Sequence, residues 1–322
     1  MSDYDECMDY RELGDSGLKV SPLCLGANVF GWTVNEQDSF PILDAFADSG
    51  LNFIDTADVY SKWVPGNSGG ESETIIGKWL KTSGKRSSVI LATKVGMELS
   101  PEKKGLSKAY IFRAVEDSLK RLQTDYIDLY QSHVDDVATP LEETLEAYDE
   151  LVKQGKVRAI GASNYKADRL AAAIDTSLRT GLPKYECLQP LYNLYDRADY
   201  ENDLEAVCHA NRLGVIPYFS LASGFLTGKY RSEADVAKYA RGSRVQKYMN
   251  ERGFKILDAL DSVSSKLGTT QSKVALAWVM ARPSITAPIA SATNIDQLND
   301  LVDATHLKLD QESIDLLNLA SA

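Results

Sequence analysis

Three consecutive apolar segments of the sequence end in side chains that can donate protons or carry charge. Asp55 ends the first segment, within FIDTADVY, and Tyr60 follows five residues later. Lys94 lies in the second segment, ILATKV, and His133 follows the third, within LYQSHVDD. If the segments are parallel strands of a barrel, their ends meet at one rim, where such folds carry their chemistry. The spacing therefore predicts that the four side chains converge.

Acid catalysis by a phenol fits this set of residue types. The ordinary tyrosine pKa is near ~10, and a buried lysine cation nearby lowers it. An aspartate beside that lysine keeps it charged, and a neutral histidine can align a carbonyl oxygen. A serine nucleophile fits less well, because Ser132 directly precedes His133 and side chains alternate between the two faces of a strand. Taken singly, each residue also has an ordinary structural explanation as a cap, a core residue or a solvated cation.

Short apolar runs, each followed by an amphipathic stretch, are the elements that would position these residues. Residues 9–22 predict a hairpin that turns near Gly14 and Gly17. Strands are then expected at eight runs typical of buried parallel sheets: 23–26, 52–55, 89–94, 126–131, 159–162, 186–190, 215–219 and 286–289.

Helix signals separate the runs. Residues 139–142 predict a capping box with Pro140 at the first helical position, in a helix ended by Gly155. The stretch SKAYIFRAVEDSLKRL carries a helical apolar stripe. Eight alternations favour an α/β TIM-type (β/α)8 barrel over a doubly wound sheet, since no GxGxxG follows the first run. No linker divides residues 1–322, so one domain is expected, with functional loops at 61–71 and 220–245.

Composition limits the classes of function. Lys and Arg total 35 against 46 Asp and Glu, so the net charge of −11 argues against a nucleic-acid binder. No apolar stretch approaches the ~20 residues of a membrane span. The acidic N-terminus lacks the apolar segment of a secretory signal peptide, so a cytoplasmic protein is expected. The widely separated cysteines are expected to be reduced and mostly buried thiols; they are Cys7, Cys24, Cys187 and Cys208. The spacing of cysteines and histidines does not suggest a metal site.

The motifs resemble those of the aldo-keto reductases. After FIDTADVY, ATKV and QSHVDD, the match continues in order through GASNY (161–165), LQPLYN (188–193), YFSLASGFLTGKY (218–230) and PIASATNIDQL (288–298). The resemblance covers nearly the whole chain. It implies a barrel whose base is plugged by the N-terminal hairpin. It also implies reduction of aldehydes and ketones with NADP(H), or the reverse oxidation, without a metal.

The resemblance assigns roles to residues of this sequence. Tyr60 would be the general acid, Lys94 and Asp55 its supporting pair, and His133 the residue that orients the carbonyl. The nicotinamide would be held by Ser163, Asn164 and Gln189, with Phe219 stacked on it. The pyrophosphate loop would comprise Ser220, Leu221, Gly224, Leu226, Thr227 and Lys229.

The adenosine end departs from the pattern of many family members, which carry a basic residue there. The corresponding Ser291, Thr293 and Gln297 are uncharged, and no Lys or Arg occurs from 283 to 307. A helix start capped by Asn294 could still hold a phosphate through backbone amides. NADP(H) is therefore expected with measurable use of NAD(H), and Arg241 and Arg244 are candidates to assist from another loop.

Three aromatic residues, Phe30, Trp32 and Trp63, follow strand ends and are expected to line a pocket for a small carbonyl or alcohol substrate of apolar or ring character. His209 and His306 are expected on helices away from the rim. Two other functions stay open: a nicotinamide-binding regulatory subunit related to channel-modulating family members, and a sugar-phosphate isomerase on a similar barrel. The oligomeric state, substrate and physiological direction are not determined by the sequence.

Overall fold

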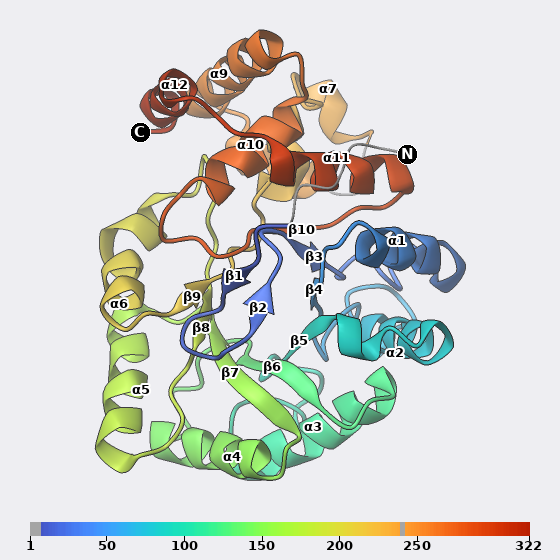
Figure 1. Cartoon of the computed structure of the whole chain (residues 1–322), viewed down its shortest axis with the longest axis vertical. Helices are drawn as coiled ribbons and strands as arrows, with labels where there is room; N and C mark the ends of the chain where they lie inside the picture. The colour runs from blue at the N-terminus through green and yellow to red at the C-terminus, as the bar shows by residue number, and fades with distance from the viewer. Residues whose placement is uncertain (1–7, 239–241) are drawn as a thin grey trace.

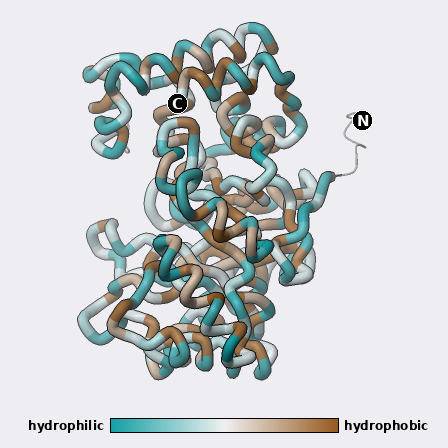
Figure 2. Tube along the Cα trace, turned by 90° about the vertical axis from the view of Figure 1, so that its left-hand side faces the viewer, coloured by the Kyte–Doolittle hydropathy of each residue, from teal (hydrophilic) through white to brown (hydrophobic). Residues whose placement is uncertain are grey.

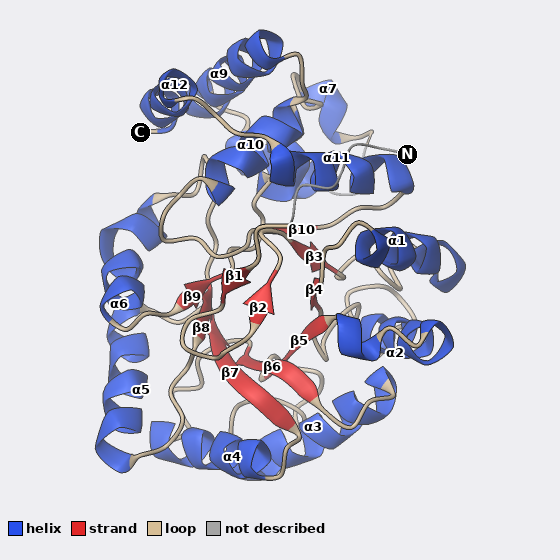
Figure 3. Cartoon of the chain, viewed as in Figure 1, coloured by secondary structure: helices blue, strands red, loops and turns tan. Residues whose placement is uncertain are grey.

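A parallel barrel forms the centre of the protein, and helices surround it (Figure 3). The computed structural model describes residues 8–238 and 242–322. The strands pair in parallel in the order β10-β3-β4-β5-β6-β7-β8-β9. Their bounds are β3 (Cys24–Gly26), β4 (Phe53–Asp55), β5 (Ile90–Val95), β6 (Ile127–Ser132), β7 (Val157–Ser163), β8 (Cys187–Gln189), β9 (Gly214–Val215) and β10 (Ile289–Ala290).

Backbone hydrogen bonds connect the two ends of this strand order. The amide of Thr286 donates to the carbonyl of Val215 at 2.8 Å, and the amide of Ile289 donates to the carbonyl of Pro217 at 2.8 Å. These bonds join the segment before β10 to the region of β9, so the sheet closes on itself. The prediction of a (β/α)8 barrel is confirmed. The largest boundary differences are at β9, which ends at Val215 although the expected run was 215–219, and at β10, which begins at the last residue of the expected run 286–289.

The predicted N-terminal hairpin is present. Strand β1 (Arg11–Glu12) pairs antiparallel with β2 (Lys19–Val20). Leu13 and Leu18, in and beside the turn, share a buried cluster with residues of the barrel strands such as Phe53 and Leu129. The hairpin crosses the end of the barrel that faces the viewer in Figure 1. Its apolar side chains therefore seal the end opposite the strand termini that carry the expected site.

Amphipathic helices cover the outside of the barrel (Figure 1). In α3 (Lys108–Leu122), Ile111, Val115 and Leu122 are buried while charged residues between them such as Glu116 and Lys120 are exposed, which produces the mixed colouring of the helices in Figure 2. The longer helices are α1 (Glu36–Asp48), α2 (Glu71–Ser83), α3 (Lys108–Leu122), α4 (Leu141–Lys153), α5 (Ala167–Thr180), α6 (Glu205–Ala210), α9 (Glu251–Leu267), α10 (Gln271–Met280), α11 (Ile295–His306) and α12 (Gln311–Ser321).

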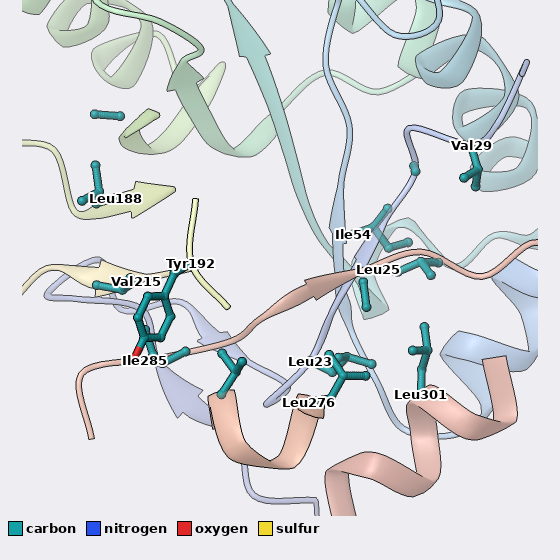
Figure 4. Packing of buried hydrophobic residues seen from close by; sticks show 14 of the residues in the cluster. Leu23, Leu25, Val29, Ile54, Leu188, Tyr192, Val215, Leu276, Ile285 and Leu301 are labelled. Atoms are coloured by element: carbon teal, nitrogen blue, oxygen red, sulfur yellow. The ribbon is translucent and has the colours of Figure 1, made fainter. Parts of the chain in front are cut away.

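The main hydrophobic cluster lies between the barrel and these helices. Figure 4 shows Leu23 and Leu25, at the start of the barrel, with Leu276 of α10 and Leu301 of α11. Complete burial of one such side chain stabilises the fold by about 1.5–3 kcal/mol. Because the cluster extends from Leu23 to Ala320, the outer helices and the strands are held together by one continuous contact surface.

Two local expectations are wrong. Pro140 is the N-cap of α4 rather than its first helical residue, and the Thr139 hydroxyl donates to Asp136 at 2.7 Å instead of capping the helix. The stretch 220–245 is not wholly irregular either. It contains the 3-10 helix η3 (Ala222–Thr227) and the short helices α7 (Glu233–Val236) and α8 (Gly242–Val245).

The cysteines match their expected state where they are described. Cys24, Cys187 and Cys208 are buried free thiols, and burial raises the pKa of each. Cys7 lies outside the described residues. Within residues 8–238 and 242–322, every helix is too short or too polar to cross a membrane.

Candidate active site

The four residues singled out by their spacing lie together at the carboxyl end of the barrel. Asp55 is the last residue of β4, Lys94 lies near the end of β5, and His133 follows β6. Tyr60 comes from the loop after β4. The Tyr60 and His133 rings have centroids 5.8 Å apart. The strand register therefore brings side chains that are far apart in the sequence to one rim.

Lys94 is the centre of the group. Its Nζ donates to Asp55 Oδ2 at 2.6 Å, to the Thr56 carbonyl at 2.8 Å and to the Tyr60 hydroxyl at 3.2 Å. The Lys94 side chain is 0% exposed and that of Asp55 is 2% exposed. All three N–H bonds of the ammonium are thus used, and one of them points at the phenol oxygen.

Electrostatics set the protonation states of these groups. Burial raises the pKa of Tyr60, and the opposing effect of Lys94 is smaller, so the sequence-based expectation of a lowered phenol pKa is wrong for the net shift. Burial also lowers the pKa of Lys94, but Asp55 and Tyr60 outweigh it and raise that pKa to about 12. At neutral pH the phenol is therefore protonated and the ammonium is charged.

His133 is held as a neutral ring. Burial, followed by the nearby Lys94 charge, brings the pKa of His133 well below 6.5. Its backbone amide donates to Val95 at 2.8 Å, and its carbonyl accepts from Asn164 Nδ2 at 2.9 Å. The buried Nδ1 has no hydrogen-bond partner. The main chain thus fixes a neutral imidazole beside the phenol, where it can donate a hydrogen bond without adding charge.

Gln131 is a site residue that the sequence reasoning missed. Its Nε2 donates to Asp55 Oδ1 at 3.1 Å, and Gln189 Nε2 donates to the same oxygen at 2.9 Å. Gln189 Nε2 also lies 3.2 Å from Gln131 Oε1. Side chains alternate along a strand, so Gln131 points to the same face as His133 while Ser132 points to the other. This alternation could have predicted Gln131 as a site residue. Ser132 itself faces outward, hydrogen-bonded to Tyr148 and Tyr185.

The residues expected at the nicotinamide lie beside this group. Ser163 ends β7 and Gln189 ends β8, in register with each other. Ser163 Oγ donates to the Gln189 carbonyl at 2.9 Å and accepts from Asn164 Nδ2 at 3.1 Å. Tyr218, a second residue missed from the sequence, donates to Asn164 Oδ1 at 2.8 Å. These contacts connect the proton-donor group to the next strand ends around the barrel.

Comparison with known proteins agrees with this arrangement. A family model described as the aldo/keto reductase family matches residues 22–321. The chain belongs to the aldo/keto reductase family. The match includes all of the strand ends described above.

Individual relatives align along nearly their full lengths. The uncharacterized oxidoreductase YrpG of Bacillus subtilis (strain 168) is 38% identical, covering 97% of this chain and 95% of the relative. The aldo-keto reductase YhdN of the same organism is 34% identical, covering 95% and 91%. A probable voltage-gated potassium channel subunit beta of Oryza sativa subsp. japonica is 33% identical, covering 90% and 89%. Members of this family are oxidoreductases that typically use NAD(P)H.

In this aldo/keto reductase, the segment expected to bind pyrophosphate has an unusual backbone. Phe219, Ala222 and Ser223 have positive φ angles of 54°, 49° and 58°, and Gly224 follows at 96°. Non-glycine residues in this region are strained, and such strain concentrates at functional sites. A Cβ built on Gly224 would lie 3.6 Å from Lys229 Nζ. The tight turns therefore bring backbone amides and a cation side by side.

The remaining residues of this segment fill structural positions. Ser220 is buried and donates to the Pro217 carbonyl at 3.0 Å, and Thr227 Oγ1 donates to the Gly224 carbonyl at 2.8 Å. Leu226 is buried and Leu221 half-buried in the main hydrophobic cluster. Their side chains anchor the turns, which leaves the backbone of the segment as the part that a diphosphate would contact.

The expected adenosine segment begins a helix, as predicted. Asn294 caps α11 by accepting from the Gln297 amide at 2.9 Å. However, the Ser291 hydroxyl donates to Asn28 at 2.7 Å, and the Thr293 hydroxyl donates to Gln297 Oε1 at 3.0 Å. Both hydroxyl protons are thus already used inside the protein.

The three aromatic residues separate into two groups. Phe30 is 0% exposed within the main hydrophobic cluster, so the expectation that it is a rim residue is wrong. Trp63 is 40% exposed and contacts the Tyr60 ring edge-on, with centroids 5.7 Å apart. Trp32 is half-buried and packs edge-on against Trp63 at 5.9 Å. The two tryptophans therefore form a wall that begins at the phenol.

The other cations and histidines considered from the sequence lie elsewhere. Arg244 contacts Trp32, with its guanidinium carbon 5.4 Å from the ring centroid. Arg241 lies outside the described residues. His209 in α6 and His306 in α11 are on helices, as expected.

Proposed function

We propose that this aldo/keto reductase reduces aldehydes and ketones to alcohols with NADP(H), or catalyses the reverse oxidation, and that Tyr60 transfers the proton. The observation that carries the proposal is the buried Lys94 ammonium, which contacts both the Asp55 carboxylate and the Tyr60 hydroxyl. A buried aspartate–lysine pair whose remaining donor faces a phenol provides the charge that a phenolate needs once its proton has left.

The side chains divide the work of carbonyl reduction between them. Tyr60, protonated at neutral pH, donates its proton to the carbonyl oxygen as negative charge develops there. Lys94 stabilises the resulting phenolate, and Asp55 keeps the ammonium in place. The neutral His133 ring orients the carbonyl oxygen through a hydrogen bond. Bound NADPH would supply the hydride. In the reverse direction, the phenolate of Tyr60 accepts the alcohol proton.

Gln189 has a free acceptor that a bound dinucleotide could use. Gln189 uses Nε2 within the protein, but its Oε1 makes no hydrogen bond to any residue in the described ranges, so it can accept from the nicotinamide amide. Ser163 and Asn164 lie beside it, and Phe219 offers a ring for stacking. The turns at 220–229, with Lys229, suit the diphosphate. Ser291, Thr293 and Gln297 would contact the adenosine end, with NAD(H) as a weaker alternative cofactor.

Trp32 and Trp63 are proposed to line the substrate pocket. Trp63, from the loop after β4, packs against Tyr60, and Trp32, from the loop after β3, packs against Trp63. A wall of aromatic rings suits a carbonyl compound with an apolar or cyclic body.

The names of two relatives favour a second function. They are probable voltage-gated potassium channel subunits beta, from Oryza sativa at 33% and Arabidopsis thaliana at 32% identity. The alternative is a nicotinamide-binding regulatory subunit. The test follows the absorbance of NADPH with a panel of aldehydes and ketones, with the Tyr60→Phe variant as control. Turnover that depends on Tyr60 supports the reductase. Tight NADPH binding without turnover of any panel member would favour the regulatory role.

We also propose that residues 1–322 form a single domain. The continuous cluster from Leu23 to Ala320 supports this, because no boundary divides it into two cores. Limited proteolysis of the native protein should release no stable fragment that spans half of the chain.

A further inference from the structure

Arg244 lies outside the catalytic group but beside the same rim. It belongs to α8, and its guanidinium carbon is 5.4 Å from the centroid of the Trp32 ring. Trp32 packs against Trp63 at 5.9 Å, and Trp63 packs against Tyr60 at 5.7 Å. A row of aromatic rings thus leads from the phenol at one end to a cation at the other.

Among the residues that the structure describes, no carboxylate pairs with Arg244. It is exposed, and its contact with Trp32 is the interaction it makes within residues 8–238 and 242–322. Other arginines of the molecule differ: Arg169 binds Asp135 through two hydrogen bonds of 2.8 Å, and Arg231 binds Asp261 at 2.8 Å. The donors of Arg244 are therefore available to a ligand.

The contact with Trp32 also prepares the guanidinium for such a ligand. An arginine held near an aromatic ring is restrained by cation–π attraction while its N–H groups stay free. These N–H groups match the two oxygens of a carboxylate or phosphate in a bidentate pair. Because the chain carries a net charge of −11, an anionic substrate needs such a local cation to overcome the general repulsion.

We propose that Arg244 binds an anionic group of the substrate, so that the preferred substrates are aldehydes or ketones that carry a carboxylate, or a similar anion, at the end remote from the carbonyl. This inference rests on the proposed reductase function. The carbonyl would lie at Tyr60, the apolar or cyclic body along Trp63 and Trp32, and the anion at Arg244. The same guanidinium could instead contact the 2′-phosphate of NADP(H), which the experiment must separate.

The test compares two aldehydes of the same shape, 4-carboxybenzaldehyde and its neutral methyl ester. Arg244→Gln should lower kcat/KM for the carboxylate about 10-fold or more, mainly through KM, since a charge-assisted pair is lost. The value for the ester should stay within about 2-fold of the unsubstituted enzyme. Arg244→Lys, which keeps the charge without the planar fork, should restore part of the preference. Lys255→Gln, an exposed change of equal charge on α9, should alter neither substrate.

Other results would overturn the proposal. An equal loss for both aldehydes in Arg244→Gln would show that the residue only supports the loop. A changed NADPH/NADH ratio with an unchanged carboxylate/ester ratio would assign Arg244 to the 2′-phosphate. Failure of the unsubstituted protein to reduce either aldehyde, or any member of the wider panel, would refute the proposed function itself and this inference with it. An active enzyme that shows no preference for the carboxylate would refute the inference alone.

Discussion

The Nζ of Lys94 lies 2.6 Å from Oδ2 of Asp55, and both side chains are buried. Removing two charges from water costs several kcal/mol per ion, so such a pair adds little to stability by itself. Removing one partner, however, leaves an uncompensated buried charge and costs about 3–5 kcal/mol. The third contact of Lys94, at 3.2 Å to the Tyr60 hydroxyl, is the one that chemistry would use. The pair is thus better explained by the phenol than by the fold.

Tyr60→Phe tests the proton donor directly. The change removes one hydroxyl and little volume, so the fold and the affinity for NADPH should stay near normal. Turnover should fall by the factor typical of general acid catalysis, about 10²- to 10⁴-fold. Steady-state kinetics with a good aldehyde substrate, together with fluorescence titration of NADPH, measure the two effects separately. A variant that keeps near-normal turnover would remove Tyr60 from the mechanism.

Lys94→Met tests the charge that supports the phenolate. Lys94 opposes the effect of burial on the pKa of Tyr60, so its removal should raise that pKa further. Alcohol oxidation needs the phenolate and should gain rate as pH rises; in the variant, any remaining activity should need a higher pH. Reduction needs the protonated phenol, so its rate in the unsubstituted enzyme should stay level up to about pH 10. An unchanged oxidation profile in an active Lys94→Met enzyme would make Lys94 purely structural. Asp55→Asn should be milder, because the lysine keeps its charge.

Gln131→Leu tests a positioning residue. The change removes one of two amide donors to Asp55 Oδ1 while keeping a similar volume in the barrel. Without it, Asp55 is held less firmly against Lys94, so kcat should fall about 10-fold and the pH profile of oxidation should move, while KM for the aldehyde stays similar. Gln131→Asn and Tyr130→Phe serve as controls for a shorter amide and for a neighbouring core change. A loss of thermal stability without any shift of the pH profile would argue against positioning.

The strand ends were predictable because a parallel barrel forces its chemistry to one rim. Asp55, Lys94 and His133 could be placed together from sequence, since Asp55 and Lys94 end apolar runs and His133 follows one. Contacts between side chains across the barrel interior could not be predicted from the sequence. Gln131 of β6 lies two strands from Asp55 of β4, and the room for its side chain depends on the strand on its other side: a Cβ on Gly161 of β7 would lie 3.1 Å from Gln131 Cγ.

The burial of individual loop residues was the second feature that could not be predicted from the sequence. Phe30 and Trp32 are two residues apart, yet one is completely buried and the other half-buried at the rim. The net pKa of Tyr60 was misjudged for a related reason. The residue types reveal the Lys94 charge, but the amount of burial that opposes it depends on how the loop folds over the site.

Asp58→Asn tests a buried carboxyl group near the site. Both Asp58 oxygens are buried without a hydrogen-bond partner, and burial followed by repulsion from Glu73 raises its pKa well above 3.8. The folded protein therefore holds this proton over a pH range in which the unfolded chain releases it. The stability that this group contributes is fully present below about pH 4. It decreases by about 1.4 kcal/mol per pH unit as the pH rises from there toward the folded pKa.

The neutral asparagine removes this pH dependence. Asp58→Asn should raise Tm relative to the unsubstituted protein more at pH 8 than at pH 4, as measured by thermal unfolding. Asp128→Asn is a matched control, since Asp128 is equally buried but paired with Arg86 and Arg158 at 2.8 and 2.7 Å, and its substitution should lower Tm. A Tm difference for Asp58→Asn that is the same at both pH values would show that the carboxyl is not held protonated.

Thr293→Arg tests how the protein recognises the adenosine end of the cofactor. A 2′-phosphate carries nearly two negative charges and is normally bound by arginine or lysine. Here, the Ser291 and Thr293 hydroxyls already donate to Asn28 and Gln297, and Asp296 places a negative charge in the first turn of α11. The remaining donors are neutral, and each such hydrogen bond contributes about 0.5–1.5 kcal/mol.

We therefore expect the unsubstituted enzyme to prefer NADPH by a modest factor and to retain measurable activity with NADH. Thr293→Arg adds the missing cation and should widen the ratio of kcat/KM for NADPH over NADH about 10-fold or more, because one charge-assisted pair replaces a neutral contact. Added salt should reduce the gain, since an exposed pair is screened. Thr293→Gln, of similar length without charge, should leave the ratio close to its original value. If the unsubstituted enzyme prefers NADH, or if Thr293→Arg and Thr293→Gln give the same ratio, the 2′-phosphate is recognised by a different part of the protein.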